Sequence, residues 1–136
     1  MTDHVLAAKP VRVRAPRGAR VFEVHWADGY IGKIPHDILR GYCPCAGCQG
    51  HSGKIKFVPG GDLELESITP VGNYALQLTW GDRHDTGLYS FRYLRALSEL
   101  AERLAADPDA DRPKLARLLS AARGRPPSRS VASLGK

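Results

Sequence analysis

The stretch Trp26–Arg40, "WADGYIGKIPHDILR", contains the local signals of a hairpin that leads into a helix. Asp28-Gly29 is a turn pair of the kind that joins two antiparallel strands. "IGKI" at 31–34 is then a short return strand. Pro35 opens the helix, where proline is favoured because the N–H that it lacks would be unpaired in the first turn. We therefore expect a β-hairpin followed directly by a helix.

A second stretch, residues 80–95, repeats this plan. "WGDRHDTGLYSFRYLR" again has a Trp-x-Asp turn, a glycine in the return strand and a helix that carries Leu-Arg. It is one residue longer, and His84 lies in the longer turn. Either a duplicated unit or the common requirements of a hairpin accounts for the likeness.

The residues before each turn alternate between apolar and polar side chains, which is the period of a half-buried strand. The apolar positions are Phe22, Val24 and Trp26 in the first stretch and Leu76, Leu78 and Trp80 in the second. Another alternating run occupies 63–71, and we expect a short strand at Ile55–Val58. Two β-hairpins, each followed by a helix, predict an α+β domain with one small, mostly antiparallel sheet. The cysteine-rich stretch at 41–51 adds a metal-binding loop to this expected fold.

The length of 136 residues suits one domain with additional segments at its ends. Ser90 is the expected N-cap of the main helix, which should end at about Ala106. The expected divisions are a flexible basic arm over 1–19, the metal-binding domain over 20–106, a last helix within 107–122 and a disordered basic tail over 123–136.

The net charge of +6 comes from the two ends of the chain. Residues 1–20 and 123–136 each carry a net charge of +4, whereas residues 21–122 carry −2. Basic tails contact phosphate weakly and without sequence preference, so we do not expect specific nucleic-acid binding. The first residues lack the apolar stretch that is typical of a secretory leader, and no apolar run in the sequence is long enough to span a membrane. We therefore expect a cytoplasmic protein with reduced thiols.

All the cysteines lie in "GYCPCAGCQGH", residues 41–51, at Cys43, Cys45 and Cys48. An odd number of closely spaced cysteines argues against a disulfide framework. Structural zinc takes four ligands and favours thiolates, so C-x-C-x₂-C predicts a zinc site that lacks one ligand. A loop of free thiols is the alternative. His51 is the local candidate for the fourth ligand and His84 the distant one, and the spacing leaves both open.

The other histidines are weaker candidates. His25 lies on the polar face of a strand and is expected at the surface, and His36 lies in the first helical turn, where we expect capping or exposure. Iron or an iron–sulfur cluster is the rival occupant of the cysteines, although their spacing matches neither common cluster run. Signatures of nucleotide-binding loops, α/β-hydrolases and zinc proteases are absent, which favours a protein that is not an enzyme.

The motifs resemble a known domain. W-x-D-G, C-P-C-x-x-C and the run "VGNYALQLTWGDRHDTGLYSFRYL" at 71–94 are similar to the N-terminal domain of gamma-butyrobetaine hydroxylase over about residues 20–97. They are also similar to small bacterial proteins that consist of this domain alone. The resemblance implies a structural zinc ion whose ligands are Cys43, Cys45, Cys48 and His84, and His51 is not among them.

The resemblance also bears on function. In the hydroxylase the 2-oxoglutarate oxygenase site lies in a separate domain, so the likeness implies a non-catalytic module, and we expect it to bind a protein partner. Similar domains are joined to P-loop ATPases that carry iron–sulfur clusters. The alternative is therefore an accessory protein in iron–sulfur cluster assembly or electron transfer, with iron or a cluster at the same cysteines.

Overall fold

The computed structural model describes residues 9–45, 55, 57–81, 84 and 87–123. Its strands form two three-stranded antiparallel sheets, each with its strands in chain order. The first sheet contains β1 (Pro10–Arg14), β2 (Val21–Trp26) and β3 (Ile31–Pro35), and the second contains β4 (Leu65–Val71), β5 (Ala75–Trp80) and β6 (Gly87–Ser90). The helices among the described residues are α2 (His36–Gly41), α4 (Phe91–Ala106) and α5 (Arg112–Arg123).

The α+β class is confirmed, but the prediction of one sheet is wrong. Each hairpin pairs with the strand that precedes it, β1 on β2 and β4 on β5, and so forms its own sheet. We call β1–β3 with α2 the first half of the molecule, and β4–β6 with α4 the second half. In both halves the helix begins directly after the third strand, α2 after Pro35 and α4 after Ser90. The likeness between the two halves therefore extends beyond the hairpins to a strand–strand–strand–helix order.

Two local expectations differ from the structure. Residues 10–14, assigned to the flexible arm, form β1, with Val13 opposite Val24 of β2. Val13 packs against the hydrophobic core, whereas Val11 is exposed. Ile55, Phe57 and Val58 are not in a strand. Instead, the Val58 N–H donates to the Gly41 carbonyl at 2.8 Å and brings the chain back beside the end of α2.

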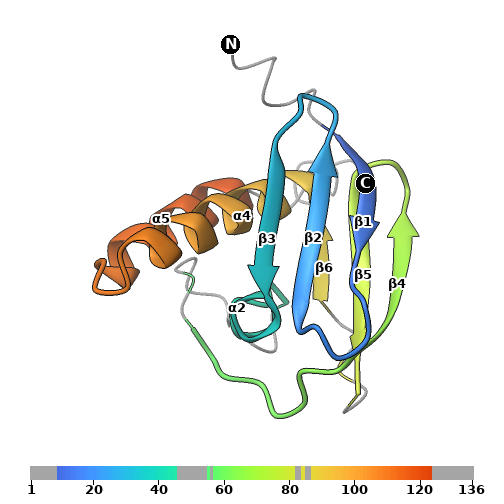
Figure 1. The fold of residues 1–136 in the computed structure, drawn as a ribbon, viewed down its shortest axis with the longest axis horizontal. Helices are drawn as coiled ribbons and strands as arrows, with labels where there is room; N and C mark the ends of the chain where they lie inside the picture. The colour runs from blue at the N-terminus through green and yellow to red at the C-terminus, as the bar shows by residue number, and fades with distance from the viewer. Residues whose placement is uncertain (1–8, 46–54, 56, 82–83, 85–86, 124–136) are drawn as a thin grey trace, which may run out of the picture.

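Both sheets and the helices α2, α4 and α5 contribute to the hydrophobic core, and the alternation predicted for β2 and β5 is confirmed. The apolar side chains of Phe22, Val24, Trp26, Leu76, Leu78 and Trp80 are buried. Figure 1 shows the two sheets one behind the other, with α4 and α5 on the side of β3. α4 packs against β3, and α5 packs against α4. No helix among the described residues is long and apolar enough to cross a bilayer.

The main helix begins and ends where the sequence predicts. Ser90 has an extended backbone, and its Oγ accepts a hydrogen bond from the Tyr93 N–H at 3.1 Å, which caps α4. The helix lies close to β3 because Gly32 faces it, and a Cβ at Gly32 would clash with Ser98 Oγ. The C-terminal helix predicted within 107–122 is α5, which extends to Arg123. The predicted tail otherwise lies outside the described residues.

Candidate metal centre

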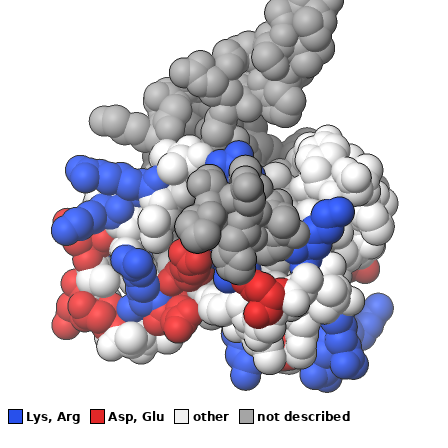
Figure 2. All heavy atoms as spheres, turned by 90° about the horizontal axis from the view of Figure 1, so that it is seen from above, with Lys and Arg blue, Asp and Glu red and all other residues white. Residues whose placement is uncertain are grey.

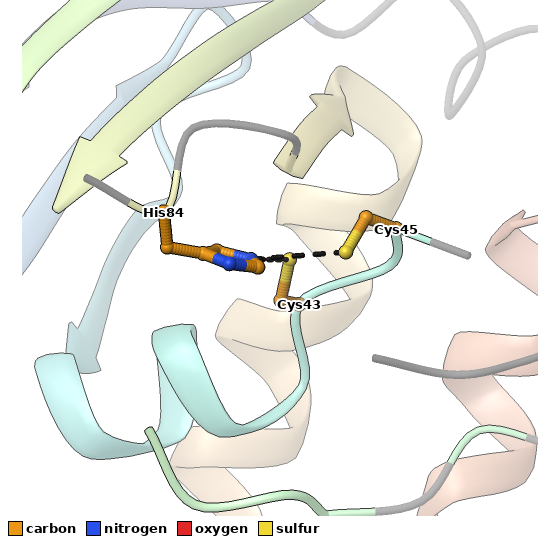
Figure 3. Close-up of side chains that lie close together, drawn as sticks. All are labelled: Cys43, Cys45 and His84. Atoms are coloured by element: carbon orange, nitrogen blue, oxygen red, sulfur yellow. Dashed lines mark hydrogen bonds between the residues drawn. The ribbon is translucent and has the colours of Figure 1, made fainter. Parts of the chain in front are cut away.

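Cys43, Cys45 and His84 lie together at one place in the structure, as Figure 3 shows. The imidazole Nε2 of His84 is 3.3 Å from Cys43 Sγ and 3.7 Å from Cys45 Sγ. The three potential ligand atoms all lie within 4.8 Å of one another. The cysteines follow α2 of the first half, whereas His84 lies in the connection between β5 and β6 of the second half. The cluster therefore joins the two halves.

The spacing of these atoms fits one tetrahedral ion. Zn–S bonds of about 2.3 Å and a Zn–N bond of about 2.0 Å place sulfur and nitrogen about 3.5 Å apart at the tetrahedral angle. The two sulfur–nitrogen distances, 3.3 and 3.7 Å, lie on either side of that value. Thiolate and imidazole are donors that suit zinc, and thiolates also suit iron–sulfur clusters. The described side chains can thus supply three ligands of one metal site.

The last turn of α2 positions Cys43. The Tyr42 N–H donates to the Ile38 carbonyl at 3.0 Å, and the Cys43 N–H donates to the Arg40 carbonyl at 3.1 Å. Cys43 is fully buried, whereas Cys45 is only partly buried. One thiol is therefore fixed in the interior and the other lies nearer the surface.

Two tyrosines of the second half hold this end of α2. Tyr89 of β6 donates its hydroxyl to the Leu39 carbonyl at 2.7 Å, and Tyr93 of α4 donates to the Tyr42 carbonyl at 2.6 Å. Burial, followed by the neighbouring Cys43, raises the pKa of Tyr89 well above its ordinary value, so the hydroxyl keeps its proton and acts as a donor. Both bonds satisfy buried carbonyls next to the cysteines.

Gly87 permits the close approach of Cys43 to β6. A Cβ at Gly87 would lie 2.8 Å from Cys43 Sγ and 2.9 Å from Tyr89 Cε1, which is closer than real Cβ contacts. Any larger residue would therefore push the thiol or the tyrosine ring away. Sequence analysis gave no role at the site to Gly87, Tyr89 or Tyr93. Their only signal was the family-like run 71–94 in which they lie.

The turn that carries His84 is closed in the same way as the first hairpin turn. The Trp80 N–H donates to the His84 carbonyl at 3.0 Å, and the Trp26 N–H donates to the Tyr30 carbonyl at 2.9 Å. His84 and Tyr30 thus occupy corresponding places, four residues after each tryptophan. Two signals in the sequence pointed to His84, namely the comparison of the two hairpins and the family resemblance.

The remaining cysteine and two of the other histidines are not part of the described cluster. Cys48 and His51 lie outside the described residues, so their part in the site stays a prediction. His25 is partly exposed on β2, where its Nε2 lies 2.6 Å from the Glu23 carboxylate.

The expectation of capping or exposure for His36 is wrong. Its side chain is 4% exposed, its Nδ1–H donates to the Leu63 carbonyl at 3.0 Å, and its ring packs edge-on against Trp80. α2 turns this face toward the core, and the backbone position alone could not indicate that.

Basic and acidic side chains are mixed on the described surface. Across the first sheet, Glu23 lies opposite Arg14 on one side and Lys33 on the other. Figure 2 likewise shows both signs close together on one side of the molecule. Such a pattern is typical of a solvated surface rather than of an extended phosphate-binding face.

Comparison with known proteins agrees with the motifs. The family of gamma-butyrobetaine hydroxylase-like N-terminal domains matches residues 13–95. A crystal structure of a protein of unknown function of the DUF971 family from Acidithiobacillus ferrooxidans is 36% identical, with a TM-score of 0.55, and the match covers 66% of this chain and 92% of that one. No curated protein matches.

Two further similar structures were determined by NMR in solution. One is 31% identical, with a TM-score of 0.59, and the match covers 76% of this chain and 85% of that one. The other is 30% identical, with a TM-score of 0.54, and the match covers 88% of this chain and 90% of that one. The matched region contains strands β2 to β6, α2 and the Cys43–Cys45–His84 cluster, and the chain therefore belongs to the gamma-butyrobetaine hydroxylase-like N-terminal domain family.

Proposed function

We propose that this chain is a non-catalytic module that binds one structural zinc ion through Cys43, Cys45, Cys48 and His84. The observation that supports the proposal is the spacing of two thiols and one imidazole nitrogen, which is that of ligands around a tetrahedral ion. Cys48 follows Cys45 at the C-x₂-C spacing that lets a loop wrap a metal, and His51 is the rival to His84.

Zinc would join the segment after α2 to the β5–β6 turn. Because binding to the folded state adds directly to the free energy of unfolding, the ion would stabilise the contact between the two halves. It would also offset the cost of a buried thiolate at Cys43, which is fully buried. Cysteines that bind a metal must be reduced, and we therefore propose the cytoplasm, where thiols stay reduced. A module without reaction chemistry would act by binding another protein.

A second candidate function is that of an accessory protein in iron–sulfur cluster assembly or electron transfer. The observation that favours it is the partial exposure of Cys45, because a cluster or iron ion that is passed between proteins must be reached from the surface. The same donors would then bind iron or a cluster.

Elemental analysis of the full chain, purified without air, tests the proposal. We expect stoichiometric zinc in the wild type and in His51→Ala, and its loss in Cys43→Ser and in His84→Ala. His25→Ala is the matched control, since this histidine lies on the far side of β2 from the core and pairs with Glu23.

Each other outcome has a definite meaning. Loss of zinc in His51→Ala alone would show that the fourth ligand is local. Iron with sulfide and visible absorbance would favour the second candidate. A wild-type protein that takes up no metal, even when zinc is added, would contradict both.

A further inference from the structure

Each hairpin turn contacts the opposite half of the molecule. The turn of the second half brings His84 to Cys43 and Cys45, and we call these three residues the thiol cluster. The turn of the first half brings Trp26, Asp28 and Tyr30 to Arg95 of α4, and we call these four residues the arginine cluster. The two clusters occupy equivalent positions, because each turn is closed by a hydrogen bond from the backbone N–H of its tryptophan to the carbonyl four residues later.

The arginine cluster consists entirely of side chains of the protein. The Arg95 guanidinium donates to both carboxylate oxygens of Asp28, at 3.0 and 3.3 Å. It also lies over the rings of Tyr30 and Trp26, 4.3 and 5.3 Å from their centroids. The Tyr30 hydroxyl donates to Glu102, which lies about two turns after Arg95 on α4, at 2.8 Å. This contact between the halves therefore needs no metal.

A glycine of the return strand allows close approach at each cluster. Gly32 of β3 faces Ser98 of α4, and Gly87 of β6 faces Cys43 after α2. At both places a Cβ would meet the opposite half at less than ordinary contact distance. The halves therefore exchange equivalent contacts, but only one of the two uses metal-binding side chains.

The two clusters differ in the surrounding contacts that support them. At the arginine cluster, α4 is a helix of 16 residues, and its Leu94 and Leu97 are fully buried in the core. At the thiol cluster, α2 has only six residues, and the Tyr89 and Tyr93 hydroxyls hold its last carbonyls. If a metal ion bound at the thiol cluster were removed, these two hydrogen bonds would still connect the end of α2 to the second half.

We propose that the two clusters connect the halves independently, so that metal release separates Cys43 and Cys45 from His84 and breaks the bond between the Trp80 N–H and the His84 carbonyl, while the arginine cluster stays closed. The metal is then a local conformational switch and not a condition for folding. The opening ends at Tyr89 and Tyr93, whose hydroxyl bonds do not involve the metal. This inference rests on the proposed metal site.

The backbone amides of the two tryptophans provide a matched pair of probes. Trp26 and Trp80 are the only tryptophans, and their N–H groups close the two corresponding turns. Amide hydrogen exchange is followed by NMR on the full chain, zinc-loaded and after removal of zinc with a chelator, with metal content measured on each sample. We expect at least tenfold faster exchange at Trp80 without zinc, and an unchanged rate at Trp26.

The reverse experiment uses zinc-loaded Arg95→Met, which keeps an apolar stem and removes the charge. Faster exchange is then expected at Trp26 alone, and Asp28→Asn is the milder variant should Arg95→Met fold poorly. If both tryptophan amides accelerate together, or neither does although zinc has been lost, the inference is wrong while the metal site stands. A wild type that never binds zinc contradicts the proposed function, and the inference with it.

Discussion

At the scale of single residues, the candidate metal centre depends on a glycine as much as on its ligands. Cys43 reaches His84 only by passing close to Gly87, where a Cβ would lie 2.8 Å from the sulfur. The position therefore couples packing to ligand geometry. Gly32 provides the same close approach at the arginine cluster, where no metal ligand is involved.

Gly87→Ala should lower the free energy of unfolding by about 1–3 kcal/mol, the usual cost of extra volume in a packed core. It should also weaken zinc binding, because the methyl group displaces Cys43 Sγ. Urea unfolding and competition with a chromophoric chelator measure the two effects. Gly32→Ala is the matched control and should lose stability without a change in zinc affinity. Equal zinc affinity in both variants would show that Gly87 does not position the thiol.

At the scale of elements, α2 is too short to be stable by itself, and the second half of the molecule holds it. The hydroxyls of Tyr89 and Tyr93 reach its last carbonyls from β6 and from α4. Because those carbonyls are buried, losing a donor leaves an acceptor without compensation. The two tyrosines therefore connect the packing of α4 with the placement of the cysteines.

Tyr93→Phe should cost about 1–3 kcal/mol of unfolding free energy, because the Tyr42 carbonyl loses its donor in a buried position. Tyr74→Phe is the matched control, since Tyr74 is 50% exposed, and it should change stability by no more than about 0.5 kcal/mol. Chemical denaturation of the zinc-free proteins makes the comparison. Similar losses of unfolding free energy in both variants would show that the bond to the Tyr42 carbonyl does not stabilise the fold.

At the scale of the whole molecule, a histidine lies in the core that the two sheets share. Burial lowers the pKa of His36 below its ordinary value of 6.5, although its bond to the Leu63 carbonyl opposes the shift. The unfolded chain therefore binds a proton more readily than the folded protein does. Stability from this group is fully present above pH 6.5 and is lost as the pH falls below that value.

We expect the free energy of unfolding of the zinc-free protein to fall on acidification below pH 6.5, with His36 contributing at most about 1.4 kcal/mol per pH unit. Zinc-free protein is used so that proton-driven metal release does not add to the slope. In His36→Asn, whose amide can still donate to Leu63, this contribution should be absent. Parallel pH curves for the wild type and His36→Asn would refute the assignment.

Sequence reasoning predicted the parts of the fold that depend on neighbours in the chain. The cap at Ser90, the end of α4 and the alternation of β2 and β5 were all predicted correctly. The split into two sheets was not predicted, because the partner of a strand is chosen by packing between segments. The same reason explains the three local errors, which are the arm that became β1, the strand expected at Ile55–Val58 and the buried His36.

The sequence by itself determined the types of the elements and the donor chemistry of the cysteine loop, since side-chain periodicity and thiol chemistry are local properties. Tertiary structure alone decided that Cys43 and Cys45 meet a histidine 41 and 39 residues away. It also decided that two tyrosines hold α2 and that each turn packs on the opposite half. Such contacts follow from how the two halves dock in one core, and spacing along the chain does not record that.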